Sequence, residues 1–479
     1  MRSRKAFLTK IVYAFSAQVV SIVLSLILVL GLPKVITIEE YGFWQLFILY
    51  NSFIGLFLLG LSDGVYLLYG GKGFKDLDPR KIKSELLFTL LSQIFFSVII
   101  ILLILFFQPK GVKQWVLIYS SFFLVIGNFI TVLGFILLAT DRIKEYSKAV
   151  FLEKATFLVL IIILYIINQL NLYEIIGIFL ISKLVSLRYL LNFYKGIKNV
   201  KILELKDLFP VIKKDSVFGI TLMLSNLTDT FILGIGKFVI ESRWDIKTFA
   251  KISLSLSAVF FFIVLITQVG LVLFPTLRKV SVSKQGEVLS ISIDFFSFLL
   301  LGFYIGYYPA IRALSSWLPA YEQGLQYLVI LMPICLYEGK MQIINKTYMK
   351  VLNKQNLLLM INISALLLCL IGTIFSGYYL NSLTGVVYSI LGCIALRSIV
   401  TQIILYRIYK LEPQGQVIND LLLSILFVVL TIKYDSVIAL ISYTSIYIVF
   451  LIIKRKKVKA VFNFIMSPSK APIVANMKS

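Results

Sequence analysis

Long apolar runs are the feature that most limits how this chain can fold. Fourteen runs of roughly 20 residues contain few charged side chains, and that is the length of a helix that crosses a bilayer. Inside lipid a chain must satisfy its own backbone hydrogen bonds, which leaves helices and closed barrels. Strands of a barrel would be about half as long and would alternate in polarity. The sequence therefore predicts an all-α polytopic membrane protein with about 14 transmembrane helices.

Composition agrees with this class. Hydrophobic residues make up 59% of the 479 residues and charged residues only 15%, against about 25% in a soluble protein. The first run is too long for the apolar part of a cleavable signal peptide, so we expect it to remain as a helix. The predicted spans are 11–32, 43–69, 86–107, 115–139, 149–167, 173–194, 216–236, 250–274, 288–308, 321–337, 357–376, 383–406, 418–433 and 436–453.

The net charge of +24 is spread over the connections between these runs. Lys and Arg concentrate in every second connection, including the one from Lys340 to Lys354. Because cytoplasmic loops carry this excess, both termini are predicted to be cytoplasmic. No soluble basic domain exists that could bind nucleic acid, so we expect no nucleic-acid partner.

The longest of these connections, "KGIKNVKILELKDLFPVIKK", predicts an amphipathic helix at residues 195–214. Ile202, Leu205 and Leu208 recur at helical spacing with lysines opposite, which is typical of a helix lying on the inner leaflet. The helix would separate an N-terminal lobe of six spans (residues 1–194) from a C-terminal lobe of six spans (residues 215–410). Residues 411–479 would supply two further spans and a basic cytoplasmic tail.

Short similarities suggest that the two lobes are repeats. "LVLGLPKVI", around Gly31, resembles "FILGIGKFVI", around Gly234, and "VSLR", ending at Arg188, resembles "IALR", ending at Arg397. Six spans per lobe would make them parallel repeats. Transporters place their substrate sites between such repeats, near the middle of the membrane, so this pattern indicates transport.

Two acidic residues within the spans are candidates for ion coupling. A charge inside a span costs roughly 2.5–3.5 kcal/mol on insertion scales and usually faces protein or water. Asp63 could hold a coupling cation or a hydroxyl group of a substrate, or it could cap or kink its helix and pair with Arg80 or Lys81. Asp229 shares a helix face with Thr221 and Ser225, which predicts either a water-exposed wall or hydrogen bonds between helices.

Three cations lie in the inner halves of spans six and twelve: Lys183, Arg188 and Arg397. Long basic side chains near a helix end often reach to the membrane surface. The alternative for Arg188 and Arg397 is a pair of anchors for a phosphate group, one on each repeat, because charged donors bind phosphate strongly.

Two further features concern helix geometry. Gly60 and Gly64 form a pair of small residues one turn apart, which predicts close packing against another helix. Pro333 falls within span ten and predicts a kink, because proline lacks the backbone donor. The kink could be static or a hinge.

Residue types needed for common enzyme chemistry are missing. The chain has no histidine, and its three cysteines all fall in apolar segments without metal-ligand spacing. No phosphate-binding loop of the Walker A type is present. We therefore expect a protein that is not an enzyme, with no catalytic residues, no metal site and no cofactor.

One stretch of about forty residues resembles a known family. In "GLPKVITIEEYGFWQLFILYNSFIGLFLLGLSDGVYLLYGG" (residues 31–71), Tyr41-Gly42 is followed by Trp44-Gln45. A Gly-x-x-Asp-Gly-x-Tyr-x-x-Tyr-Gly-Gly pattern then begins at Gly60. Both features look like the N-terminal region of bacterial polysaccharide flippases, the Wzx-type O-antigen and capsule transporters of the MOP exporter superfamily.

This resemblance implies two six-helix lobes in a V around a central cavity, plus two C-terminal helices. It implies that the substrate is an undecaprenyl-diphosphate-linked oligosaccharide, flipped from the cytoplasmic to the outer leaflet of the bacterial inner membrane. Membrane lipids, H⁺ or Na⁺ and a polysaccharide polymerase would be partners. The implied contacts are Arg188, Arg397 and Lys183 for the diphosphate, Trp44, Gln45, Asn51 and Asn226 for sugars, and Asp63 and Asp229 for the coupling ion.

Two other functions stay open at this stage. An ion-coupled multidrug exporter of the same superfamily would want an acidic cavity, and twelve spans are usual there. A membrane scaffold without transport activity fits poorly with charges inside the spans. The first span carries Gln18 and serines where the lipid II branch of the superfamily is rich in arginine, so lipid II is disfavoured as the substrate.

Overall fold

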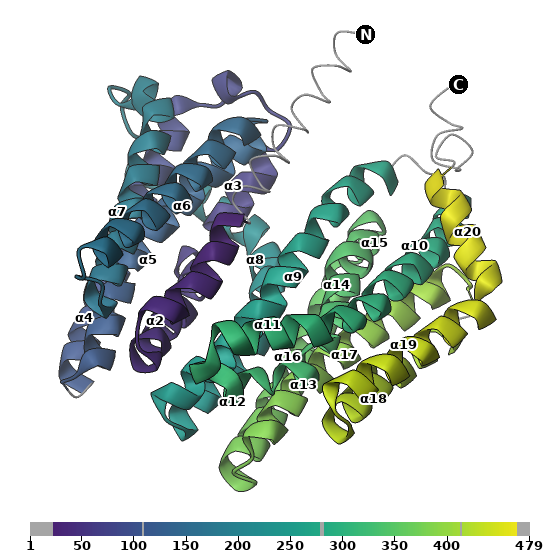
Figure 1. Cartoon of the computed structure of the whole chain (residues 1–479). Helices are drawn as coiled ribbons and strands as arrows, with labels where there is room; N and C mark the ends of the chain where they lie inside the picture. The colour runs from purple at the N-terminus through teal and green to yellow at the C-terminus, as the bar shows by residue number, and fades with distance from the viewer. Residues whose placement is uncertain (1–22, 108–109, 278–281, 412–413, 467–479) are drawn as a thin grey trace. The chain divides into compact units, whose positions relative to one another are not determined.

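The computed structural model describes residues 23–107, 110–277, 282–411 and 414–466, and every regular element within these ranges is a helix. The chain divides into two compact units, Met1–Thr230 and Phe231–Ser479. Figure 1 labels the helices of both units. The predicted all-α fold is confirmed.

The first unit is built around one helix, α5. Helix α5 packs against α2, α3, α4, α6 and α7, and its apolar side chains form much of the core. After an apolar helix at Val23–Val35, the elements are α2 (Ile38–Asn51), η1 (Ile54–Leu58), α3 (Leu61–Tyr69), η2 (Phe74–Asp76), α4 (Pro79–Phe107), α5 (Val112–Ala139), α6 (Ile143–Ile166), α7 (Leu172–Leu191), η3 (Asn192–Ile197) and the beginning of α8 (Leu205–Arg243).

The second unit is built around the helical stretch Leu328–Val351, in which 94% of the most apolar 18 residues are buried. Within it, α14 packs against α9, α10 and α17. The elements after α8 are α9 (Ile246–Leu277), α10 (Val282–Phe303), η4 (Tyr304–Gly306), α11 (Tyr307–Trp317), η5 (Pro319–Tyr321), α12 (Glu322–Leu325), α13 (Leu328–Leu331), α14 (Pro333–Lys340), η6 (Met341–Asn345), α15 (Lys346–Val351), α16 (Gln355–Ile374), η7 (Phe375–Tyr379), α17 (Leu383–Ile408), α18 (Gln414–Lys433), α19 (Ser436–Ile453) and α20 (Arg455–Met466).

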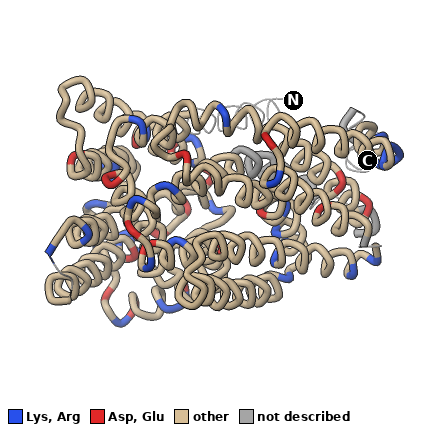
Figure 2. The backbone as a smooth tube through the Cα atoms, turned by 60° about the horizontal axis from the view of Figure 1, so that its bottom comes forward, with Lys and Arg blue, Asp and Glu red and all other residues tan. Residues whose placement is uncertain are grey.

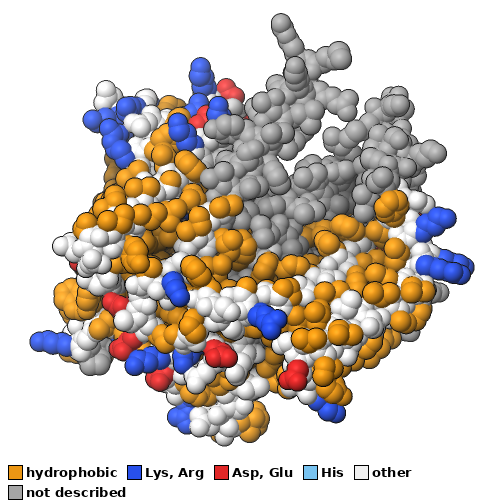
Figure 3. All heavy atoms as spheres, in the orientation of Figure 1, with side chains coloured by type: hydrophobic (Ala, Val, Ile, Leu, Met, Phe, Trp, Pro, Cys, Tyr) orange, Lys and Arg blue, Asp and Glu red, His pale blue; other side chains and the backbone are white. Residues whose placement is uncertain are grey.

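Twelve helical stretches of the described chain are long and apolar enough to cross a membrane. The helix Val23–Val35 and α7 account for the other two predicted spans, although the part of span one before residue 23 lies outside the described residues. Helix α7 carries Glu174, Lys183 and Arg188, which lowers its apolar character. Hydrophobic side chains cover broad areas of the described surface that faces the viewer in Figure 3. The chain is a multi-pass membrane protein.

The second predicted span, residues 43–69, is wrong as a single helix. Its backbone leaves the helix after α2 and turns at Leu59 (φ 50°) and Gly60 (φ 83°), which are both left-handed. Glycine adopts this conformation without a steric penalty. The turn starts a new helix, α3, that carries Asp63.

The paired glycines of α3 are in close contact with α8, as their spacing predicts. A Cβ atom on Gly64 would lie 1.7 Å from the carbonyl oxygen of Asp215, and one on Gly219 would lie 2.0 Å from that of Gly60. The two backbones can approach this closely only because all three positions lack a side chain. This glycine contact fixes where Asp215 lies relative to α3.

The placement of Lys340 in a loop is also wrong. Lys340 is 1% exposed and ends α14, and Lys346, 9% exposed, begins α15. The ammonium group of Lys340 forms an ion pair with Asp420 of α18, which offsets the penalty of burying it. Figure 2 shows acidic and basic residues along helices as well as at their ends. Pro333 interrupts the same span, because α13 ends at Leu331 and α14 begins at the proline.

Helix α8 begins inside the predicted connector and continues to Arg243, past the division at Thr230. Ile202, Leu205 and Phe209 are exposed, whereas Leu208 packs against the core of the first unit. Exposed apolar residues beside lysines are typical of a helix start at a membrane surface. The domain limits at 194/195 and 214/215 stay predictions.

The glycine contact can be tested by Gly64→Ala. The added methyl group has no room, so we expect the unfolding midpoint to fall, with a loss of about 1–3 kcal/mol from overpacking. Gly177→Ala is the matched control, because a Cβ there meets nothing within 4 Å and alanine favours the helix. Thermal unfolding of the purified protein in detergent would measure both variants, and equal midpoints would contradict the tight contact.

Candidate functional site

A polar cavity lies among the helices of the first unit. Its volume is about 390 Å³, within the usual size range of ligand pockets. Asn51 at the end of α2, Asn128 of α5, Glu153 of α6 and Lys183 and Ser186 of α7 contribute polar groups to its wall. Four helices therefore place their few polar side chains around one space.

A charged pair forms one side of this cavity. Lys183 Nζ lies 2.8 Å from Glu153 Oε1, and both side chains are mostly buried. The ammonium group also lies 5.2 Å from the ring centre of Phe179 and 5.4 Å from that of Phe123, which are favourable cation–π distances. The lysine is thus held in place at the wall, and its charge is balanced by the glutamate.

Two amides line the same cavity but differ in how they are satisfied. Asn128 donates to the carbonyl oxygen of Ile54 at 2.8 Å and to Gln93 Oε1 at 2.7 Å. Asn51 has both amide atoms buried, with no hydrogen-bond partner among the described residues. Buried polar groups are nearly always hydrogen-bonded, so the Asn51 amide is suited to a polar ligand or water.

The aromatic residues near the cavity pack against one another. The Trp44 ring stacks on Phe47 and Phe157 and meets Phe179 edge-on, at centroid distances of 5.5 to 5.7 Å. Trp44 is 7% exposed and Gln45 6% exposed, and Gln45 donates to the Tyr41 hydroxyl at 2.8 Å. Both residues support the wall from behind and are not among those that line the cavity.

The three predicted phosphate anchors lie in different surroundings. Lys183 lines the cavity, whereas Arg188, five residues further along α7, is exposed and donates to Asn192 Oδ1 at 3.0 Å. Arg397 belongs to α17 of the second unit, where it is 2% exposed and forms an ion pair with Glu338. Lys183 is therefore the one of the three that lines the cavity described above.

Both predicted ion-coupling residues involve helix α8: Asp229 lies on it, and Asp63 forms a hydrogen bond with it. Asp63 is 8% exposed and accepts hydrogen bonds from Ser62 at 3.3 Å and from the amide of Asn226 at 3.4 Å. Asp229, also on α8, is half-buried. The structure thus joins Asp63 with Asn226, two residues predicted for different roles.

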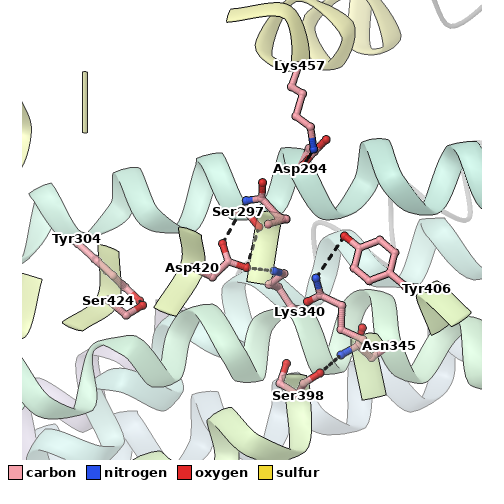
Figure 4. A network of polar contacts seen from close by, with 12 residues as sticks. Asp294, Ser297, Tyr304, Lys340, Asn345, Ser398, Tyr406, Asp420, Ser424 and Lys457 are labelled. Atoms are coloured by element: carbon pink, nitrogen blue, oxygen red, sulfur yellow. Dashed lines mark hydrogen bonds and ion pairs between the residues drawn. The ribbon is translucent and has the colours of Figure 1, made fainter. Parts of the chain in front are cut away.

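A second polar network lies inside the second unit (Figure 4). Asp420 accepts from Lys340, from Ser297 at 3.3 Å and from Gln416 at 3.2 Å. One turn away on α10, Asp294 lies 3.1 Å from Lys457 of α20. These contacts attach α18 and α20 to α10 and α14.

Solved structures of known proteins share this fold, although no family model and no curated protein matches the sequence. "Lipid II flippase MurJ" in an inward closed conformation matches with a TM-score of 0.62 at 14% identity, covering 94% of this chain and 100% of that one. An inward-facing MATE family multidrug resistance transporter of the MOP superfamily matches with a TM-score of 0.57 at 15% identity, covering 82% and 98%. A MOP superfamily transporter from Pyrococcus furiosus matches with a TM-score of 0.52 at 15% identity, covering 84% and 95%.

The chain has the MOP transporter fold. The matched proteins are transporters. At these identities the likeness concerns the fold alone, so the substrate of this MOP-fold chain must be argued from its own residues.

Sequence reasoning missed the acidic partners in this MOP fold. Glu153, Asp294 and Asp420 all lie within predicted spans, and their charge alone was a signal that they needed partners. Glu85 and Asp215 fall one residue outside the predicted spans 86–107 and 216–236 and were therefore not considered as charges within spans. The spacing of Lys81 and Glu85 by four residues could have indicated that both lie on α4.

The Lys340–Asp420 pair provides a stability test of the second unit. Asp420→Asn leaves the buried ammonium group without its counter-charge, so we expect a loss of about 3–5 kcal/mol, measured as the thermal unfolding midpoint in detergent. Asp435→Asn is the control, because Asp435 is exposed and its side chain forms no capping hydrogen bond.

A double variant, Lys340→Met with Asp420→Leu, should recover most of this loss, because replacing a buried pair by apolar side chains is often neutral. A wild-type midpoint for Asp420→Asn alone would show that the pair contributes little.

Proposed function

We propose that this chain is a transporter that flips an undecaprenyl-diphosphate-linked oligosaccharide from the cytoplasmic to the outer leaflet of a bacterial inner membrane. The product would serve the synthesis of a surface polysaccharide such as O-antigen, capsule or exopolysaccharide. The observation that carries this proposal is the polar cavity of the first unit. The buried amide of Asn51 in its wall has no hydrogen-bond partner among the described residues.

The chemistry of the cavity fits a sugar head group. A sugar cannot cross hydrocarbon unaided, because its hydroxyl groups would lose their hydrogen bonds to water. Amides and hydroxyl groups of Asn51, Asn128 and Ser186 can replace those bonds, and the aromatic side chain of Phe123 offers an apolar wall. In this proposal Trp44, Gln45 and Asn226 assist by shaping the surroundings of the sugar site.

The diphosphate requires cationic groups. Lys183 can supply one if a phosphate takes the place of Glu153 as its partner. Arg188, which is exposed, and Arg397, which is paired with Glu338, remain proposed anchors. Binding at Arg397 would have to compete with the glutamate, so Arg188 is the more accessible of the two arginines.

Coupling to H⁺ or Na⁺ through Asp63 and Asp229 belongs to the same proposal. Alternating access between the two membrane faces needs a difference in binding energy between states, and a cation bound at a buried acid can provide it. A polysaccharide polymerase would act on the flipped product.

A multidrug exporter is the second candidate, supported by the match to a MATE family transporter. Such a protein would bind organic cations, which the carboxylate of Glu153 could attract if Lys183 moved away. Export of cationic dyes from cells that produce the chain would favour this function, and normal dye retention with changed surface polysaccharide would favour the flippase.

Asn51→Leu tests the flippase. The variant keeps a similar side-chain size but removes the amide, so we expect about a tenfold drop in the outward-facing share of lipid-linked oligosaccharide, equal to roughly 1.4 kcal/mol of binding. The measurement compares lipid-linked oligosaccharides on the two membrane faces in a deletion strain that expresses each variant.

Asn199→Leu is the control, because Asn199 is exposed in the segment before α8. Unchanged export with Asn51→Leu, at equal protein level in the membrane, would remove the cavity from the transport path. Equal loss with both variants would indicate a general defect.

The membrane orientation has its own test. Gly196→Cys should be labelled by an impermeant thiol reagent only after the cytoplasmic face is opened, and Gly111→Cys should be labelled in intact cells. Both glycines are exposed with open space around them, and the native cysteines are buried. The reverse pattern would place both termini outside the cell.

A further inference from the structure

A cluster of two carboxyl groups and one lysine lies in the first unit, apart from the cavity. Glu85 of α4 and Asp215 of α8 each have side chains that are 0% exposed, and Lys81 of α4 lies between them. The apolar core residues Val65, Leu86 and Ile212 come from the same three helices, α3, α4 and α8. The cluster is therefore buried in an apolar environment.

The contacts of the cluster are well defined. Lys81 Nζ lies 3.3 Å from Glu85 Oε1 and 3.1 Å from Asp215 Oδ2. The Tyr69 hydroxyl, from α3, lies 2.9 Å and 2.7 Å from the two oxygens of Glu85 and donates to that carboxyl group. The lysine ammonium group also lies 5.1 Å from the ring centre of Tyr69.

The charges of this cluster do not balance if both acids are ionised. Two carboxylates and one ammonium leave a surplus of one negative charge, and Tyr69 adds a neutral donor. Other charged groups near these helix ends, such as Asp78, Arg80 and Lys214, are exposed and solvated. An uncompensated charge in this setting is strongly unfavourable, whereas one bound proton makes the cluster neutral.

A proton fits better than a metal ion. The space between the two acids is already taken by the lysine ammonium group, and the described residues contain no group of three or more acidic, cysteine or histidine side chains suited to a metal. Two carboxyl groups close to one another share their protons as a pair.

We propose that Glu85 and Asp215 together bind one exchangeable proton, and that Lys81 connects this site to the water outside the unit. Lys81 is 24% exposed while both acids are 0% exposed, so the lysine is the group that joins the site to solvent. Proton loss would leave a negative charge that strengthens the hold of Lys81 on α8, and proton gain would weaken it.

The position of the site allows a change in its protonation to affect the packing of α8 against α3. Asp215 provides the backbone oxygen against which Gly64 packs, so a change in the side-chain partners of Asp215 acts at the same contact. Asp63, which also lies in the first unit, has other partners, Ser62 and Asn226. The role of this proton in transport rests on the proposed function, but the proton site itself does not.

Infrared spectroscopy of the purified protein tests the site without any substrate. A buried protonated carboxyl group gives a carbonyl-stretch band, and we expect one such band at about pH 7, well above the ordinary titration range of Asp and Glu. Charge balance predicts that Glu85→Gln removes this band completely, because Asp215 then pairs with Lys81 as an ion. Asp215→Asn should remove it for the same reason.

Two further variants sharpen the test. Lys81→Met should keep or strengthen the band, because it removes the cation and leaves two acids. Asp294→Asn should leave the band unchanged and is the matched control for a buried acid outside the cluster, because Asp294 is buried and paired with Lys457. Size-exclusion chromatography checks folding, and the wild-type spectrum alone already decides whether a buried proton is present.

Three results would overturn the proposal. One is no protonated band in the wild type, which means that both acids are ionised. Another is a band that survives in either Glu85→Gln or Asp215→Asn, which puts the proton elsewhere. The third is a band that is lost when sodium is added at constant pH, which makes the ligand a cation. Loss of oligosaccharide export in Asn51→Leu with an intact band would keep this site separate from the substrate proposal.

Discussion

A charged side chain in an apolar surrounding must find a partner, and this constraint organises the structure. Three pairs of charged residues within the helices follow this rule: Lys340 with Asp420, Arg397 with Glu338, and Lys183 with Glu153. Each pair joins two different helices. The apolar surface of a helix has a similar free energy in contact with lipid and in contact with protein. Specific polar contacts therefore help to define which helices pack together.

The cavity of the first unit follows from the same constraint. Helices α2, α5, α6 and α7 each carry polar groups that would be unfavourable against lipid, so these groups turn towards a shared space. The aromatic residues behind the wall, with Trp44 at their centre, pack among themselves and hold the wall in place. A cavity with a polar lining, supported by tightly packed aromatic residues behind it, is suited to binding a polar molecule within the membrane.

The cluster around Glu85 and Asp215 differs because its charges are unequal in number. In the other pairs, one cation meets one anion. Here two acids meet one lysine beside the glycine contact of α3 and α8. An imbalance of charge can be corrected by a small ligand, whereas a balanced pair serves mainly to hold helices together. This contrast separates a group with a candidate chemical role from those with a structural one.

The sequence by itself determined the helical membrane class and the approximate limits of most spans, because the preference for lipid is summed along consecutive residues. It also predicted that Gly60 and Gly64 lie in close contact with another helix, because small residues at helical spacing let two backbones approach. Only the tertiary structure decided the break at Leu59 and Gly60, the burial of Lys340 and the identity of every acid partner. Those features depend on residues far apart in the chain that meet across helices, such as Lys81 and Asp215, and no local pattern encodes that meeting.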